Sequence, residues 1–173
     1  MDAGTDAPAR EHAASEAGEK MTMDEQQAME RRLVVRLMHY WRSLGDIDGF
    51  PRRSDIDPEA IADMWPHCAL LDVSGKETDP EFVYVGSALT ARAGAELTGR
   101  LLSSAAPDSL VSKGFSYFGQ VLDRKVPISF GGEFADGRGV KILYRSIILP
   151  LSQDGSDITG LLAAVNCREV TQE

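Results

Sequence analysis

Two cysteines and three histidines are the side chains of this 173-residue sequence best suited to bind a metal or to react. Cys68 and Cys167 each lie within an apolar run typical of a buried strand, without a Cys-x-x-Cys spacing. His12, His39 and His67 fall in three separate segments and lack the spacing of metal ligands. We therefore interpret both cysteines as core thiols and expect no metal site.

The sequence contains few features of a catalytic site. The sequence has no Gly-x-Ser-x-Gly elbow, no phosphate-binding glycine loop followed by Lys-Ser/Thr, and no His-Glu-x-x-His motif. Glu133 is the acid placed well inside a predicted strand, and no base or histidine is near it in sequence. Gly131 and Gly132 beside it indicate a bulge or bend. We expect a protein that is not an enzyme; a small enzyme using Glu133 is the alternative left open.

The net charge of −9 is concentrated near the N-terminus, since residues 1–30 hold eight acids and two bases. Residues 1–21 contain no large apolar side chain besides Met1 and Met21 and are predicted to form a disordered acidic tail. An acidic chain without a basic face predicts no direct binding of nucleic acid. No apolar run approaches the roughly 18 residues of a membrane span, and the N-terminus does not resemble a secretory signal. A cytoplasmic protein is expected.

Apolar residues recur at steps of three and four through the segment 22–45, which predicts an amphipathic helix. Gly45 suits the position just past its C-terminal end. The stripe formed by Leu33, Leu37 and Trp41 must be buried against the sheet, a second copy or a partner. Our leading hypothesis is that this helix flanks the domain and makes a homodimer or partner interface.

The segment 46–170 is predicted to form one α+β domain. Asp57-Pro58 indicates the start of a short helix that ends at Pro66, and a second amphipathic helix is expected over about 108–122. The strands are separated by turn signals, Asp-Gly in the last two hairpins, and are expected at 68–73, 82–86, 127–134, 140–151 and 158–168. Consecutive hairpins make the sheet antiparallel, with helices on one face.

Several short segments occur in an order that resembles a known family: "FPRRSDIDPEAI", "WPHCALLDV", "FVYVGSAL", "ELTGR" and "RSIILPLSQDGSDITGLLAAV". They resemble the single-domain PAS proteins of the alphaproteobacterial type, a PAS_5-like family, over about 31–170. The resemblance implies a PAS-like five-stranded antiparallel sheet in the order 2-1-5-4-3, with helices cupping one face. The elements predicted from the residues follow the same order.

The resemblance also implies a sensory or protein-interaction module. PAS domains bind haem, flavin, small metabolites or nothing in the cup between helices and sheet, and they signal through flanking helices or the outer sheet face. Members of this subfamily resemble cytoplasmic regulators associated with kinase pathways. The implied partner is therefore a signalling protein such as a histidine kinase or an adaptor.

The cup can be tested for cofactor chemistry at particular residues. A haem ligand from the long helix is not expected, because residues 108–124 contain no histidine, cysteine or methionine. A photoactive flavin needs its Asn-Cys-Arg on a helix, whereas Asn166-Cys167-Arg168 ends the last predicted strand. No haem or flavin is therefore expected. Core packing and a small-metabolite pocket, with the Tyr144 hydroxyl as its polar group, both remain open for five candidate lining residues: Phe115, Phe118, Phe130, Tyr144 and Leu162.

Overall fold

A computed structural model describes residues 22–45, 49–75 and 79–171, so the predicted tail 1–21 lies outside the described residues. The chain forms a five-stranded antiparallel sheet in the order β2-β1-β5-β4-β3, which confirms the predicted topology. The strands are β1 Cys68–Asp72, β2 Glu81–Val85, β3 Ile128–Ala135, β4 Lys141–Leu151 and β5 Gly160–Val170.

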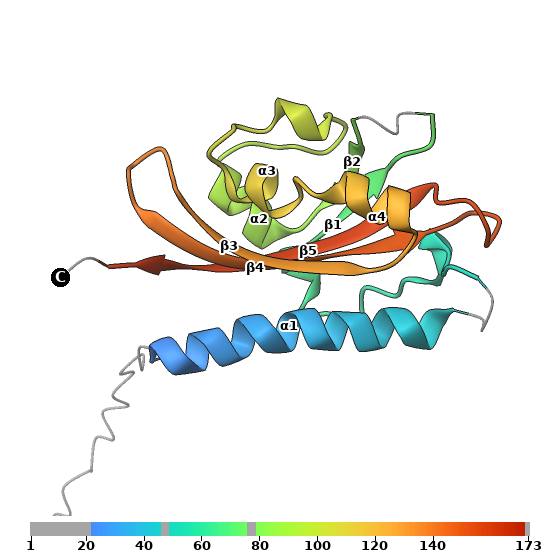
Figure 1. Cartoon of the computed structure of the whole chain (residues 1–173), viewed down its shortest axis with the longest axis horizontal. Helices are drawn as coiled ribbons and strands as arrows, with labels where there is room; N and C mark the ends of the chain where they lie inside the picture. Colours follow the sequence, from blue (N-terminus) through green and yellow to red (C-terminus); the bar gives the residue numbers. More distant parts are fainter. Residues whose placement is uncertain (1–21, 46–48, 76–78, 172–173) are drawn as a thin grey trace, which may run out of the picture.

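Helices cover both faces of this sheet. The long helix α1 (Met23–Leu44) lies along one face, here called the outer face, and the short helices lie on the opposite, inner face (Figure 1). The inner-face helices are α2 (Ser87–Ala93), α3 (Leu110–Gly114) and α4 (Phe118–Arg124). Three 3-10 turns complete the fold: η1 Arg53–Asp55, η2 Trp65–His67 and η3 Leu102–Ser104.

Helix α1 forms where the sequence predicts an amphipathic helix, and a capping box starts it. The Thr22 hydroxyl accepts a hydrogen bond from the Glu25 amide and the Glu25 carboxylate accepts one from the Thr22 amide, which together cap the free amides of the first turn. Leu33 and Leu37 are buried against the sheet. Burial of this stripe supplies most of the energy that holds a helix to a sheet. The sheet side of this outer core consists of Cys68, Leu70, Ile147, Leu149, Leu151, Leu162 and Ala164.

The prediction of one continuous helix over about 108–122 is wrong. It is divided into α3 and α4 by a turn at 115–117. A Cβ at Gly114 would lie 2.9 Å from Val165 Cγ2, so α3 ends where it touches the sheet. The Tyr117 hydroxyl then hydrogen-bonds the Ser146 hydroxyl at 2.8 Å, a buried contact between residues far apart in the sequence.

Two smaller expectations also change. The segment after Asp57-Pro58 forms hydrogen-bonded turns followed by η2 in place of a short helix. The pair Gly131-Gly132 does not mark a bulge, because β3 pairs with β4 in regular register from residue 128 to 135. A Cβ at Gly132 would lie 2.7 Å from the Tyr144 hydroxyl oxygen, so this glycine provides space for the tyrosine side chain.

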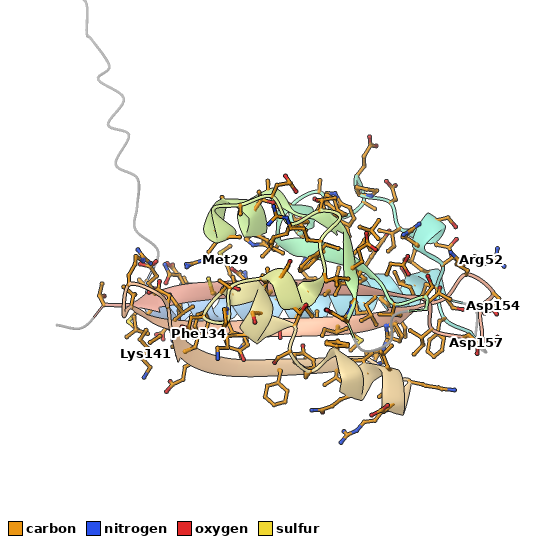
Figure 2. All side chains as sticks on the ribbon, turned by 90° about the horizontal axis from the view of Figure 1, so that it is seen from above. Met29, Arg52, Phe134, Lys141, Asp154 and Asp157 are labelled. Carbon is orange, nitrogen blue, oxygen red and sulfur yellow. The ribbon has the colours of Figure 1, made fainter. Side chains whose placement is uncertain are left out.

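The two ends of the sheet differ in their side chains. Asp154 and Asp157 in the β4–β5 turn lie at the same end as Arg52, whereas Met29, Phe134 and Lys141 lie at the other end (Figure 2). At the first end the Asp154 carboxylate accepts hydrogen bonds from the amides of Ser156 and Asp157, at 2.9 and 3.0 Å. These amide bonds hold the pKa of Asp154 well below its usual range.

Candidate functional site

The five predicted cup residues do not surround one cavity. Phe115 is fully buried in the inner core, and Phe118 and Tyr144 pack against the same core. Phe130 is on the edge strand and is 51% exposed. Leu162 lies on the outer face of the sheet, in the core beneath α1, so its assignment to the cup is wrong.

The centre of the inner face is filled by side chains. The Tyr117 ring lies 5.2 Å from the Phe130 ring, measured between centroids, and its hydroxyl is bonded to Ser146. Burial raises the pKa of Tyr117 far above its usual value, so this phenol stays protonated. Since α3 also touches the sheet at Gly114, core packing is the interpretation that fits Phe115 and its neighbours.

The two thiols lie on opposite faces of the sheet. Cys68 is fully buried beneath α1, where its Sγ donates to the Met64 carbonyl at 3.3 Å. Burial raises the pKa of the Cys68 thiol to about 12, so it is a core thiol with little thiolate at neutral pH. Cys167 is partly buried on the inner face. The sequence Asn166-Cys167-Arg168 lies within β5, as expected, and not on a helix.

Glu133 does not point into the core. Its side chain is 60% exposed, and one carboxylate oxygen lies 3.1 Å from Lys141 Nζ. The alternative of a small enzyme required an acid or histidine that points into the core. The Glu133 side chain points outward, so its assignment to a catalytic site is wrong.

The stripe predicted to make a dimer contacts its own sheet. Leu33 and Leu37 are buried in the outer core, and Trp41 Nε1 donates a hydrogen bond to the Pro150 carbonyl at 2.8 Å. A partner could reach Leu33 and Leu37 only if α1 left the sheet, and Trp41 is partly buried against the same core. The hypothesis of an interface made by these three residues is therefore corrected: the sheet, one of the three possibilities for this stripe, covers it.

Two polar contacts add to the attachment of α1. The Arg36 guanidinium forms a two-pronged ion pair with the Asp63 carboxylate, with the Nη2–Oδ1 distance at 3.1 Å. The hydrogen bond from Arg36 holds the pKa of Asp63 below its usual value. The Asp57 amide donates to the Tyr40 hydroxyl at 2.7 Å. These contacts fix the rotation of α1 about its own axis, and this rotation determines which of its side chains face outward.

The outward face of α1 carries a basic stripe that sequence reasoning missed as a surface. Arg32, Val35, Arg36, His39 and Arg42 recur at steps of three and four and are all exposed. Val35 is 53% exposed in the middle of this stripe. The signal was available in the sequence, because residues 31–44 hold four arginines and no acid in a chain of net charge −9. We refer to these five residues as the basic stripe.

Comparison with known proteins identifies the family. The family model described as a PAS domain matches residues 29–163, which is more than half of the chain. The chain belongs to the PAS domain family. PAS domains are a sensory and signalling fold that is generally not enzymatic. No curated protein matches this PAS domain in sequence.

Several solved structures are similar to this PAS domain. The light-state LOV domain of the blue-light photoreceptor Aureochrome1 is 12% identical with a TM-score of 0.44, over 66% of this chain and 88% of that one. The LOV domain of the Erythrobacter litoralis EL346 blue-light activated histidine kinase is 11% identical with a TM-score of 0.42, over 61% and 95%. The VqmA dimer of Vibrio cholerae is 15% identical with a TM-score of 0.46, over 67% and 52%.

Within residues 22–45, 49–75 and 79–171, no helix is both long and apolar enough to cross a bilayer.

Proposed function

We propose that this PAS domain is a non-catalytic regulator of a bacterial signalling pathway, and that it acts in the cytoplasm by binding a signalling protein such as a histidine kinase or an adaptor. The observation that carries the proposal is the basic stripe on α1. It is fixed in orientation by the contacts of Trp41, Arg36 and Tyr40, and it is opposite in sign to the chain as a whole.

The chemistry of the stripe indicates the kind of partner. Arginine side chains around an exposed apolar residue are typical of protein interfaces, where arginine is enriched and a small apolar centre is surrounded by polar groups. We infer a partner surface with acidic side chains around an apolar patch that receives Val35. Complementary charges of this kind raise the rate of encounter and help to exclude wrong partners.

Co-purification from the native cytoplasm with charge-reversal variants tests this function. Arg32→Glu combined with Arg42→Glu should remove the signalling protein that wild type enriches, because both changes reverse the sign of the stripe. Arg124→Glu, on α4 at the inner face, is the matched control and should keep it. The proposal fails if wild type enriches no signalling protein over an untagged strain, or if the double variant retains the partner as well as Arg124→Glu does.

Homodimerisation through α1 is a second proposal, now placed on the exposed stripe. Its support is weaker, because two copies of a basic stripe repel each other. Light scattering measures it directly: a dimeric mass that becomes monomeric in Val35→Glu supports a dimer through the stripe, and a monomeric wild type overturns it.

A further inference from the structure

Two arginines of the basic stripe carry charge that the described part of the chain does not neutralise. Arg36 is already paired with Asp63. Arg32 and Arg42 are exposed, and among residues 22–45, 49–75 and 79–171 no carboxylate lies within ion-pair distance of either. Their positions are about 15 Å apart along α1, at 1.5 Å per residue. The outward side of α1 therefore offers two guanidiniums to an acidic segment.

The segment 1–21 of the same chain has the opposite charge. It holds five acids and two bases, for a net charge of −3, whereas residues 31–44 hold four arginines and no acid. Unlike charges attract each other over about 10 Å at 0.1 M salt. The five acids are Asp2, Asp6, Glu11, Glu16 and Glu19.

The length of this segment and the place where it joins α1 allow it to reach the stripe. The segment ends at Thr22, the N-cap of α1. Along the helix axis Arg32 lies about 15 Å from Thr22 and Arg42 about 30 Å, at 1.5 Å per residue. A chain spans at most about 3.3–3.6 Å per residue, so Glu16 can lie up to about 20 Å from Thr22 and Glu11 up to about 36 Å. Carboxylates of the segment can therefore reach both arginines.

We propose that the segment 1–21 binds along the basic stripe of its own chain, with its carboxylates on Arg32 and Arg42, and that it competes there with the signalling partner. The tether raises the concentration of the segment at the stripe to about the millimolar range. Exposed ion pairs are individually weak, so the contact covers the stripe for about half of the time and yields to a partner that also binds Val35. The competition rests on the proposed function, whereas the contact itself does not.

Paramagnetic broadening of amide signals in the full chain measures the contact. A nitroxide is attached at Ala13→Cys, which lies between two acids of the segment, in a Cys167→Ser background. Cys68 stays unlabelled, because its thiol is buried and largely protonated. The label should broaden the amide signals of Val35 and His39 much more than that of Val126 on the inner side.

Charge variants of the segment should change this broadening in opposite directions. Neutralising its five acids, Asp to Asn and Glu to Gln, should reduce the broadening at Val35 and His39 at least about twofold, because a contact present for about half of the time is lost. Neutralising its two bases, Arg10→Gln with Lys20→Gln, should increase the broadening. Raising the salt from about 0.1 M to 1 M shortens the Debye length from about 10 Å to about 3 Å and should reduce it.

Variants of the stripe locate the contact. Arg32→Gln combined with Arg42→Gln should reduce the broadening as much as the neutralised segment does, and Arg124→Gln on α4 is the matched control with unchanged broadening. The proposal is overturned if either the neutralised segment or the double arginine variant broadens these amides as strongly as wild type. The remaining amide shifts of each variant separate a lost contact from a lost fold.

A mixed sample distinguishes the chain's own segment from that of a second copy. Spin-labelled chain without ¹⁵N, mixed with ¹⁵N-labelled chain that carries no nitroxide, should broaden neither Val35 nor His39. Broadening in this sample that matches the broadening within one chain places the segment of a second copy on the stripe and overturns the proposal.

Co-purification from the native cytoplasm tests the competition separately. The chain with the neutralised segment should enrich about twofold more signalling partner than wild type, because about half of the stripes are freed. Equal enrichment of the partner by both chains overturns the competition. A wild type that enriches no partner overturns the proposed function and the competition together, whereas the contact is judged by the paramagnetic measurement alone.

Discussion

The outer and inner faces of the sheet are both covered, but in different ways. One 22-residue helix covers the outer face through a continuous apolar stripe and a few polar contacts in its C-terminal half. The inner face is covered by α2, α3 and α4, none longer than seven residues, which touch the sheet through Gly114 and the Tyr117–Ser146 pair. The outer face is therefore covered by a single long helix, which can carry a binding surface. The inner face is covered by several short helices, with a pocket at their edge.

Thiol reactivity should give the largest contrast between the faces. We expect iodoacetamide to label Cys167, which is partly exposed, at least about a hundredfold faster than Cys68, whose thiol is buried and largely protonated. Mass spectrometry of peptides from the native protein measures both rates. Equal labelling of the two cysteines in the folded chain would mean that α1 does not cover the outer face for most of the time.

Truncating the outer stripe should have the largest effect on stability. Leu37→Ala removes a fully buried side chain between α1 and the sheet, and we expect a loss of about 2–5 kcal/mol in the free energy of unfolding in urea. Val35→Ala, on the exposed side of the same helix, is the control and should stay within about 0.5 kcal/mol of wild type. Similar losses in the two variants would contradict the assigned rotation of α1.

Adding one carbon atom on the inner face should reduce the free energy of unfolding by less than the loss expected for Leu37→Ala. Gly114→Ala places a Cβ 2.9 Å from Val165 Cγ2, and overpacking of this kind costs about 1–3 kcal/mol of unfolding free energy. Val165→Ala in the same chain should recover part of the loss. Gly119→Ala in α4 meets open space and should be neutral or stabilising by up to about 1 kcal/mol. If Gly114→Ala is as stable as Gly119→Ala, the close contact of α3 with the sheet is wrong.

Removing the exposed ion pair between Arg36 of α1 and Asp63 should have the smallest effect on stability. Arg36→Gln should change the free energy of unfolding by no more than the error of a urea titration, because solvent screens the pair. The pKa of Asp63 is lowered by Arg36, so any contribution is present at neutral pH and is lost as the pH falls through that pKa. A large loss in Arg36→Gln at neutral pH, measured beside Arg32→Gln, would show that α1 depends on this pair more than on its apolar stripe.

Local periodicity and turn residues predicted the strands and α1, and the resemblance to a known family implied the order of the strands in the sheet. Neither predicted the break at 115–117, since the bond between Tyr117 and Ser146 joins residues far apart in the chain. Leu162 was assigned to the wrong face because residues 161–165 are all apolar and buried, and a strand covered on both sides shows no alternation.

The surface that covers the α1 stripe could not be predicted either. Amphipathic spacing shows that Leu33, Leu37 and Trp41 are buried, but the same spacing serves a sheet and a second helix equally well. The small pocket among η2, α2, α3 and β5 had no sequence signal, because its lining comes from four elements that are separate in the chain.

Site-specific photo-crosslinking tests the central claim, that the basic stripe binds a signalling protein, most directly. A photoreactive amino acid in place of Val35 (53% exposed), expressed in the native cytoplasm, should capture one signalling protein. The same amino acid in place of Val126, a valine 45% exposed between α4 and β3 on the inner side, should not capture it. Capture of the partner at Val126 and not at Val35, or of no signalling protein at Val35, would contradict the account.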